Sequence, residues 1–144
     1  MMLFQNRFRS LMRAGVLVVM LLGTGLALAQ DAGELIEDRL AIQGAWVRVD
    51  APYILEFGYG EDGLLQSAYF NRRFINVART ETAVVDSLFY VQVELKDRDY
   101  EGSTYTLVYE RNEDALYGTY LHGGTGNLYE VQFIRKPEET PEVK

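Results

Sequence analysis

The feature that most constrains the fold is an alternation of apolar and polar residues with a period of two, which begins at residue 45 and recurs almost to the end of the chain. A period of two is typical of β-strands, whose successive side chains point to opposite faces. The pattern is sharpest from Phe89 to Leu95, where every second residue is apolar. Seven or eight strands are predicted, over residues 45–49, 53–59, 64–70, 74–85, 89–95, 104–110, 115–121 and 128–134.

The segments that join these strands are short. Residues 61–63 (EDG) and 122–127 (HGGTGN) have turn composition, and no segment between strands has the length of a helix. Parallel strands need long crossovers, so consecutive strands are expected to pair antiparallel. Closing such a sheet on itself removes its exposed edges. The sequence therefore predicts an all-β fold, an antiparallel up-and-down barrel, with a two-sheet sandwich as the alternative.

The first 29 residues have the composition of a secretory signal peptide. Arg7, Arg9 and Arg13 precede an uncharged run that ends in Ala27-Leu28-Ala29, and a basic start, a short apolar centre and an A-x-A end are the three parts of such a leader. We expect cleavage after Ala29, with an uncleaved membrane anchor as the alternative. The mature protein is then expected to be periplasmic or secreted, without stable membrane insertion.

The chain is therefore expected to consist of three parts. Residues 1–29 are the predicted signal peptide, residues 30–136 the predicted barrel domain, and residues 137–144 a polar, proline-containing tail that we expect to be disordered. Within the domain, residues 31–43 (DAGELIEDRLAIQ) predict a short helix, with Asp31 as its N-cap and Leu35, Ile36 and Leu40 at helical spacing.

Charge and cysteine content exclude several classes of function. The formal net charge is −7, and removing the three leader arginines takes it to about −10. Because nucleic-acid binding needs a basic surface, nucleic acid is not an expected partner. The acidic balance serves solubility, or attracts a cationic ligand or partner. The chain has no cysteine, which excludes disulfides, thiol catalysis and cysteine metal sites.

The only tryptophan, Trp46, stands at the start of the first predicted strand. A closed sheet needs a seal at one end, and a large aromatic side chain preceded by a glycine can supply it. Gly44-Ala45-Trp46 resembles the G-x-W signature of the lipocalin and calycin barrels, and it too follows a short N-terminal helix. The resemblance implies that Arg135, at the end of the last strand, stacks on Trp46 through a cation–π contact.

Two further segments carry the resemblance. Ser103-Thr104-Tyr105 is similar to the T-D-Y motif of those families, although the aspartate is absent. Residues 68–80 (AYFNRRFINVART) and 116–137 (LYGTYLHGGTGNLYEVQFIRKP) resemble small exported lipocalin-like domains of bacteria that have no assigned function. The resemblance implies a lipocalin-like barrel, a fold that can hold a ligand, and it identifies no ligand.

No catalytic or metal-binding constellation is visible. His122 is the only histidine, and no serine or cysteine is placed to serve as its nucleophile. Residues 97–102 (DRDYEG) match the first half of a calcium loop, but the twelfth position is Val108 in place of glutamate. The glycines of residues 123–127 join two strands and do not open a helix, so they do not predict a phosphate site. No cofactor or metal is expected, and the protein is not expected to be an enzyme.

Tyrosines and arginines supply the candidate site residues. The chain has 10 tyrosines, and those on predicted apolar faces are candidates to line a cavity: Tyr53, Tyr59, Tyr105, Tyr109 and Tyr129. The alternative is that these rings fill the barrel themselves, since an eight-stranded interior is only wide enough for side chains or one small ligand. Three arginines are candidates to receive an anionic group or to lie in solvated turns: Arg72, Arg73 and Arg79.

Together these patterns favour a binding module that holds a small apolar or aromatic ligand inside a β-barrel. The second hypothesis is a filled barrel that acts as an interaction protein and binds another component of the cell envelope. The first predicts a cavity lined by tyrosines. The second predicts no such cavity and an exposed apolar patch beside Arg72 and Arg73.

Overall fold

The computed structural model describes residues 25–137, with side chains from Ala32 onward. It contains one helix and nine strands in this order: α2 (Gly25–Ala41), β1 (Gly44–Arg48), β2 (Ile54–Tyr59), β3 (Leu65–Asn71), β4 (Arg73–Ile75), β5 (Val77–Val85), β6 (Leu88–Leu95), β7 (Thr104–Glu110), β8 (Ala115–Leu121) and β9 (Leu128–Arg135). The predicted leader before Gly25 and the predicted tail beyond Pro137 lie outside the described residues.

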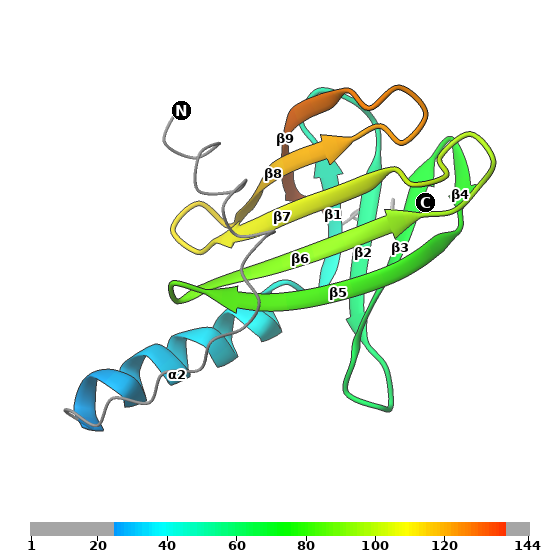
Figure 1. Cartoon of the computed structure of the whole chain (residues 1–144). Coiled ribbons are helices and arrows are strands. Elements are labelled where there is room, and N and C mark those ends of the chain that lie inside the picture. Colours follow the sequence, from blue (N-terminus) through cyan, green and yellow to red (C-terminus); the bar gives the residue numbers. More distant parts are fainter. Residues whose placement is uncertain (1–24, 138–144) are drawn as a thin grey trace, which may run out of the picture.

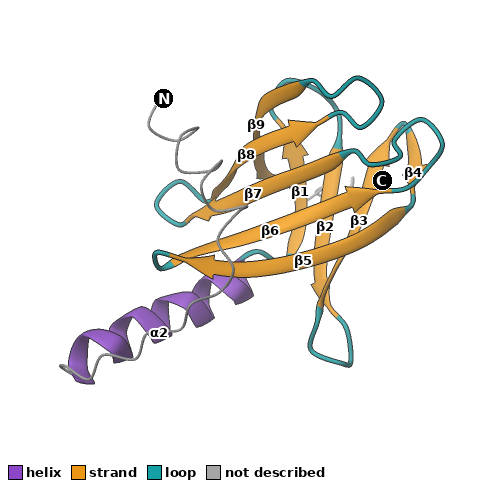
Figure 2. Cartoon of the chain, in the orientation of Figure 1, coloured by secondary structure: helices purple, strands orange, loops and turns teal. Residues whose placement is uncertain are grey.

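All nine strands belong to one antiparallel sheet with the order β4-β3-β2-β1-β9-β8-β7-β6-β5. Neighbours in the sheet are also neighbours in the chain, except that β1 pairs with β9. This pairing rolls the meander into a nearly closed barrel (Figures 1 and 2). The predicted all-β antiparallel up-and-down barrel is therefore confirmed. The strand count of seven or eight is corrected to nine.

The additional strand comes from a corner at Asn76. Residues 74–85 were expected to form one strand, but β4 pairs with β3 whereas β5 pairs with β6. The Asn76 amide donates a hydrogen bond of 2.8 Å to Asp97, and the Asn76 carbonyl accepts one of 3.0 Å from the Lys96 backbone. These contacts fix the chain at the point where it passes from β4, at one edge of the rolled sheet, to β5, at the other edge.

The barrel is closed at this corner and open farther along the same seam between β3 and β5. Among the described residues, β5 forms ladder hydrogen bonds with β6 only. A hydrogen bond of 2.6 Å between the hydroxyls of Ser67 and Thr80 spans the seam. Beyond it the strands separate around a pocket of about 540 Å³ lined by residues that include Leu64, Leu65 and Val91.

Large side chains fill the barrel interior. The largest fully buried side chains come from every strand except β5 and from Ile42, which directly follows α2, and they include Trp46, Tyr69, Tyr105, Phe89 and Phe133. On β6 the residues from Phe89 to Leu95 alternate between buried and partly exposed, as the period of two predicts. Packing of this kind, without a disulfide, supplies the stability of the domain.

Helix α2 projects from one end of the barrel (Figure 1). Asp31 lies within this helix, so the prediction that Asp31 is its N-cap is wrong. The described helix, Gly25–Ala41, includes residues 25–29 of the predicted leader and ends two residues before the expected end. No helix within residues 25–137 is long and apolar enough to cross a membrane.

Candidate ligand-binding site

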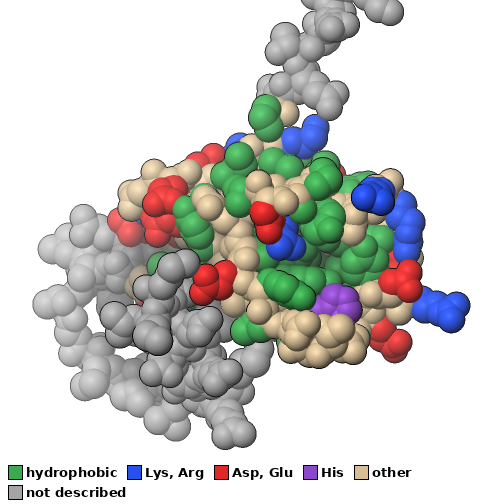
Figure 3. All heavy atoms as spheres, turned by 90° about the horizontal axis from the view of Figure 1, so that it is seen from above, with side chains coloured by type: hydrophobic (Ala, Val, Ile, Leu, Met, Phe, Trp, Pro, Cys, Tyr) green, Lys and Arg blue, Asp and Glu red, His purple; other side chains and the backbone are tan. Residues whose placement is uncertain are grey.

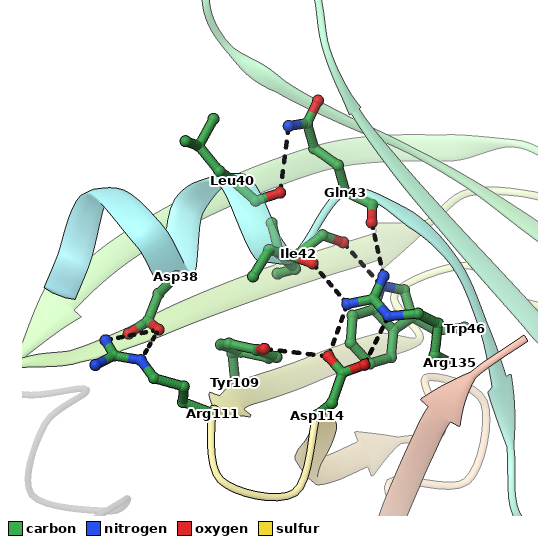
Figure 4. A network of polar contacts seen from close by, with 10 residues as sticks. Asp38, Leu40, Ile42, Gln43, Trp46, Tyr109, Arg111, Asp114 and Arg135 are labelled. Carbon is green, nitrogen blue, oxygen red and sulfur yellow. Dashed lines mark hydrogen bonds and ion pairs between the residues drawn. The ribbon is translucent and has the colours of Figure 1, made fainter.

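One end of the barrel is sealed by Trp46, whose side chain is completely buried. Its indole N–H donates a hydrogen bond of 2.8 Å to the Ile42 carbonyl, so it also fixes the end of α2 (Figure 4). The Arg135 guanidinium lies 4.1 Å from the centre of the indole ring. Gly44 has a φ of 105°, and a Cβ there would lie 3.4 Å from Arg135 Nη1. Glycine at this position adopts the positive φ without strain and leaves room for the Arg135 guanidinium.

Arg135 also connects the seal to its surroundings. It donates two hydrogen bonds to Asp114, of 2.8 and 2.7 Å, and others to the carbonyls of Gln43 and Ala41 at 3.0 and 2.8 Å. The hydrogen bonds from Arg135 hold the pKa of Asp114 below its usual range. These contacts satisfy carbonyls at the end of α2 that the helix itself leaves free.

The opposite end carries a pocket of about 480 Å³, which we call the mouth pocket. It lies where the β1–β2, β3–β4, β6–β7 and β8–β9 connections meet, at the end of the barrel away from α2. Its residues are Arg48, Asp50, Ala51, Tyr53, Tyr69, Asn71, Asp99, Tyr100, Tyr120, His122 and Tyr129. Figure 3 shows the only histidine, in purple, beside hydrophobic side chains on this surface.

The aromatic rings of the mouth pocket pack against one another. Tyr69 makes edge-to-face contacts with Tyr53 and Tyr100, with ring centres 6.3 and 6.1 Å apart. Tyr120 stacks with Tyr129 at 6.3 Å. Tyr105, buried beneath the pocket, lies 5.5 Å from Tyr69 and 4.6 Å from Tyr120. Such contacts hold the rings in place without a ligand.

Burial holds the hydroxyl groups of Tyr69 and Tyr105, at the base of the pocket, in the neutral form. The Tyr69 and Tyr105 hydroxyls are 3.1 Å apart and share a hydrogen bond. Burial raises the pKa of Tyr105 to about 12 and raises that of Tyr69 further. Asn71 donates a hydrogen bond of 2.6 Å to the Tyr100 hydroxyl. Neutral phenols donate and accept hydrogen bonds but are weak bases and nucleophiles, so the group is suited to binding.

Arg48 is the only lysine or arginine among the residues that line the pocket. Its side chain is 10% exposed and forms two hydrogen bonds with Asp50, of 2.6 and 2.9 Å. Burial opposes its charge, but the hydrogen bonds to Asp50 and Tyr105 outweigh burial and raise the Arg48 pKa. The guanidinium also lies 5.5 Å from the Tyr53 ring centre. The pocket therefore contains a fixed ion pair beside its rings.

No protein-family model matches this chain, and searches of curated proteins and of solved structures find no significant match.

The structure brings together two of the five tyrosines proposed to line a cavity, Tyr53 and Tyr129. Tyr105 is completely buried under the mouth pocket, and Tyr109 packs against Trp46 at the sealed end. The Tyr59 hydroxyl donates a hydrogen bond of 2.9 Å to the Arg39 carbonyl, next to α2. Tyr105 and Tyr109 thus belong to the buried core, and Tyr59 is partly buried against it.

The three candidate arginines lie outside the mouth pocket. Arg73 forms an ion pair of 2.8 Å with Asp97, and Arg79 forms one of 2.8 Å with Glu94. Arg72 is exposed in the turn between β3 and β4 and has a φ of 60°. The carboxylate partners of Arg73 and Arg79 leave these two side chains poorly suited to receive an anion.

Sequence reasoning missed Arg48, Tyr69, Tyr100 and Tyr120 as pocket residues. For two of them the alternation contained the signal. Tyr69 comes four residues after Leu65 and Tyr120 comes four residues after Leu116, so each tyrosine shares the buried face of its strand. His122, the only histidine of the chain, lines the pocket, and its Nδ1 accepts a hydrogen bond of 3.2 Å from the Thr125 backbone. No group of three histidine or acidic side chains suited to a metal occurs within the described part of the chain.

The buried phenols predict a loss of stability at high pH. A tyrosine whose pKa is raised in the folded state contributes stability that is complete below the ordinary value of 10.0 and is lost as the pH rises past it. We therefore expect the urea midpoint to fall between about pH 10 and pH 12. In Tyr105→Phe the fall should be shallower, because one of the groups is gone. Ionisation of every tyrosine near pH 10 in the folded protein, followed by absorbance, would contradict this arrangement.

Proposed function

We propose that this protein is a binding module that holds a small, flat apolar or aromatic ligand in the mouth pocket of its β-barrel. The observation that carries the proposal is a pocket of about 480 Å³ that is lined by five tyrosines among polar residues, above an interior that is already filled. Ligand sites commonly occupy about 300–1,000 Å³ and combine apolar walls with a few fixed polar groups. In this pocket those groups are the Arg48–Asp50 pair and the tyrosine hydroxyls.

The proposal favours binding over catalysis for a physical reason. The buried hydroxyls have raised pKa values, with burial as the main cause, and therefore stay protonated at neutral pH. Packed rings also reduce the entropy cost of ordering the site when a ligand enters. A rigid aromatic pocket whose buried phenols stay protonated supports retention of a ligand better than proton transfer or nucleophilic attack.

Removing a ring from the pocket wall tests this function. With the neutral dye N-phenyl-1-naphthylamine as fluorescent probe, Tyr53→Ala and Tyr129→Ala should each weaken binding about threefold to tenfold, because each loses one stacking surface. Tyr117→Ala is the matched control. It removes a ring from the other face of β8, where Tyr117 bonds to Glu113 and Gln132 outside the pocket. Equal losses in all three variants would show that the dye binds elsewhere.

Native mass spectrometry of the protein from its own host tests ligand carriage directly. A defined additional mass on a monomer supports the binding module, and a bare monomer that also fails to bind the dye contradicts it. We further propose that the protein acts outside the cytoplasm, for which the composition of residues 1–29 is the support. The same spectrum measures the chain mass, and a mature chain that begins at Gln30 is the expected result.

A second candidate function is that of an interaction protein of the cell envelope. The observation in its favour is Phe74, which is 52% exposed between Arg73 and the corner of the barrel and contacts Phe70 with ring centres 5.4 Å apart. Exposed aromatic side chains beside arginine are common where proteins bind one another. A heavier complex in the native mass spectrum, lost in Phe74→Ser, would favour this function.

A further inference from the structure

We propose that the mouth pocket selects a small organic cation, an ammonium group carried on an apolar or aromatic skeleton. This rests on the proposed binding function and specifies the class of ligand. Three features of the pocket support a cation: the pairing of Arg48 with Asp50, the unpaired carboxylate of Asp99 and the arrangement of the tyrosine rings.

The positive charge in the pocket is already neutralised. Arg48 directs Nε and Nη2 to the two carboxylate oxygens of Asp50, at 2.6 and 2.9 Å. Its remaining contacts are with Tyr105 and with the ring of Tyr53. A bidentate pair of this kind is one of the stronger polar contacts in proteins. An anionic ligand would have to displace Asp50 from Arg48, and the pocket offers it no other arginine or lysine.

The negative charge in the pocket is in excess. Asp99 lines the pocket from the β6–β7 connection, and its carboxylate has no hydrogen-bond or ion-pair partner among the described side chains. Asp50, on the other side of the pocket, is 56% exposed at its side chain. With the one arginine already paired, Asp99 leaves the pocket net negative. The acidic balance of the whole chain adds a field of the same sign.

The tyrosine rings suit a cation for an independent reason. The face of an aromatic ring carries partial negative charge and attracts cations, and several rings around one space form an aromatic cage for ammonium groups. Tyr53 and Tyr100 lie in separate connections of the barrel, Tyr129 lies near the start of β9, and all three line the pocket. Tyr69 and Tyr120 hold them in place through ring contacts at 6.1 to 6.3 Å. The Arg48 guanidinium already lies over one face of Tyr53, so a ligand cation would use Tyr100 and Tyr129 together with the Asp99 carboxylate. A neutral molecule gains from the rings alone.

A matched set of probes tests the selectivity. Phenyltrimethylammonium and tert-butylbenzene have nearly the same shape and differ in charge, and benzoate supplies the opposite charge. By titration of the pocket tyrosine resonances in NMR spectra of the purified mature protein, we expect the cation to bind at least about tenfold more tightly than the neutral probe. Benzoate should bind more weakly than either. The advantage of the cation should shrink as salt is added, because the carboxylates are partly exposed.

Two variants that each remove one negative charge test whether Asp99 causes the preference for the cationic probe. Asp99→Asn should weaken binding of phenyltrimethylammonium about fivefold and leave tert-butylbenzene unchanged, since an exposed ion pair contributes a modest free energy. Glu101→Gln is the matched control, because it removes the same charge from the same connection at an exposed residue that does not line the pocket. Equal effects of the two variants would reduce the preference to the general acidity of the protein and overturn the assignment.

The outcomes separate this proposal from the one on which it rests. Equal binding of the cationic and neutral probes in the pocket overturns cation selection and leaves the binding function standing. Preferential binding of benzoate does the same and shows that Asp50 yields Arg48 to an anion. If none of the probes and no naphthylamine dye bind, both proposals fail.

Discussion

Replacing Trp46 with alanine should lower the free energy of unfolding by about 3–5 kcal/mol, the cost typical of removing a fully buried large aromatic side chain. Trp46 is 0% exposed, and its loss would remove the contact with Arg135 and the hydrogen bond to Ile42 as well. Urea unfolding followed by circular dichroism measures the change, because the variant has no tryptophan to report by fluorescence.

Two further variants test the reason for the effect. Phe74→Ala removes an aromatic ring that is 52% exposed and should cost under about 1 kcal/mol. Trp46→Phe keeps a ring at the sealed end but leaves the Ile42 carbonyl without its donor, so it should cost an intermediate amount. A small effect of Trp46→Ala, similar to that of Phe74→Ala, would mean that the indole does not seal the barrel.

The second large effect is expected at Gly118, in the middle of β8. A Cβ at this position would lie 1.9 Å from the Thr106 carbonyl oxygen and 2.9 Å from the Leu107 Cα, both on β7. These are backbone atoms, which cannot rotate away, so Gly118→Ala must push the paired strands apart. We expect a loss of about 3 kcal/mol in stability, at the upper end for overpacked sites. Amide exchange should accelerate most along the pairing of β7 with β8.

Gly58→Ala is the matched control for this variant. Gly58 also lies within a strand, β2, but a Cβ there meets nothing within 4 Å and its φ is outside the left-handed region. Alanine restricts the unfolded chain more than glycine, so this variant should match or exceed the parent by up to about 1 kcal/mol. If both variants lost stability equally, general strand propensity would explain the result and the close approach at Gly118 would not.

The sequence was sufficient to predict the fold because the evidence for it is local. The alternation from Phe89 to Leu95 defines a strand with one buried face, and short turns allow only antiparallel neighbours. The split between β4 and β5 could not be predicted, because it depends on the contact of Asn76 with Asp97, 21 residues away in the chain. Nothing near Asn76 in the sequence marks a corner.

The candidate site was only partly predictable for a geometrical reason. Alternation tells which face of a strand a side chain occupies, but not how far along the barrel axis it lies. Tyr105 and Tyr109 share the inward face of β7, yet one lies beneath the mouth pocket and the other touches Trp46 at the sealed end. Tyr100 lies in a connection, where no period applies, so only the folded chain brings it to the pocket.

The seam between β3 and β5 determines where the wall of the cylinder is weakest. Near Asn76 the wall is continuous, because the chain itself passes from β4 into β5. Past the Ser67–Thr80 hydroxyl bond, β5 pairs with β6 alone among the strands of residues 25–137, and local opening begins where the fewest backbone hydrogen bonds must break. Thermal fluctuations should therefore detach the far part of β5 first, while the rim around the tyrosines keeps its shape.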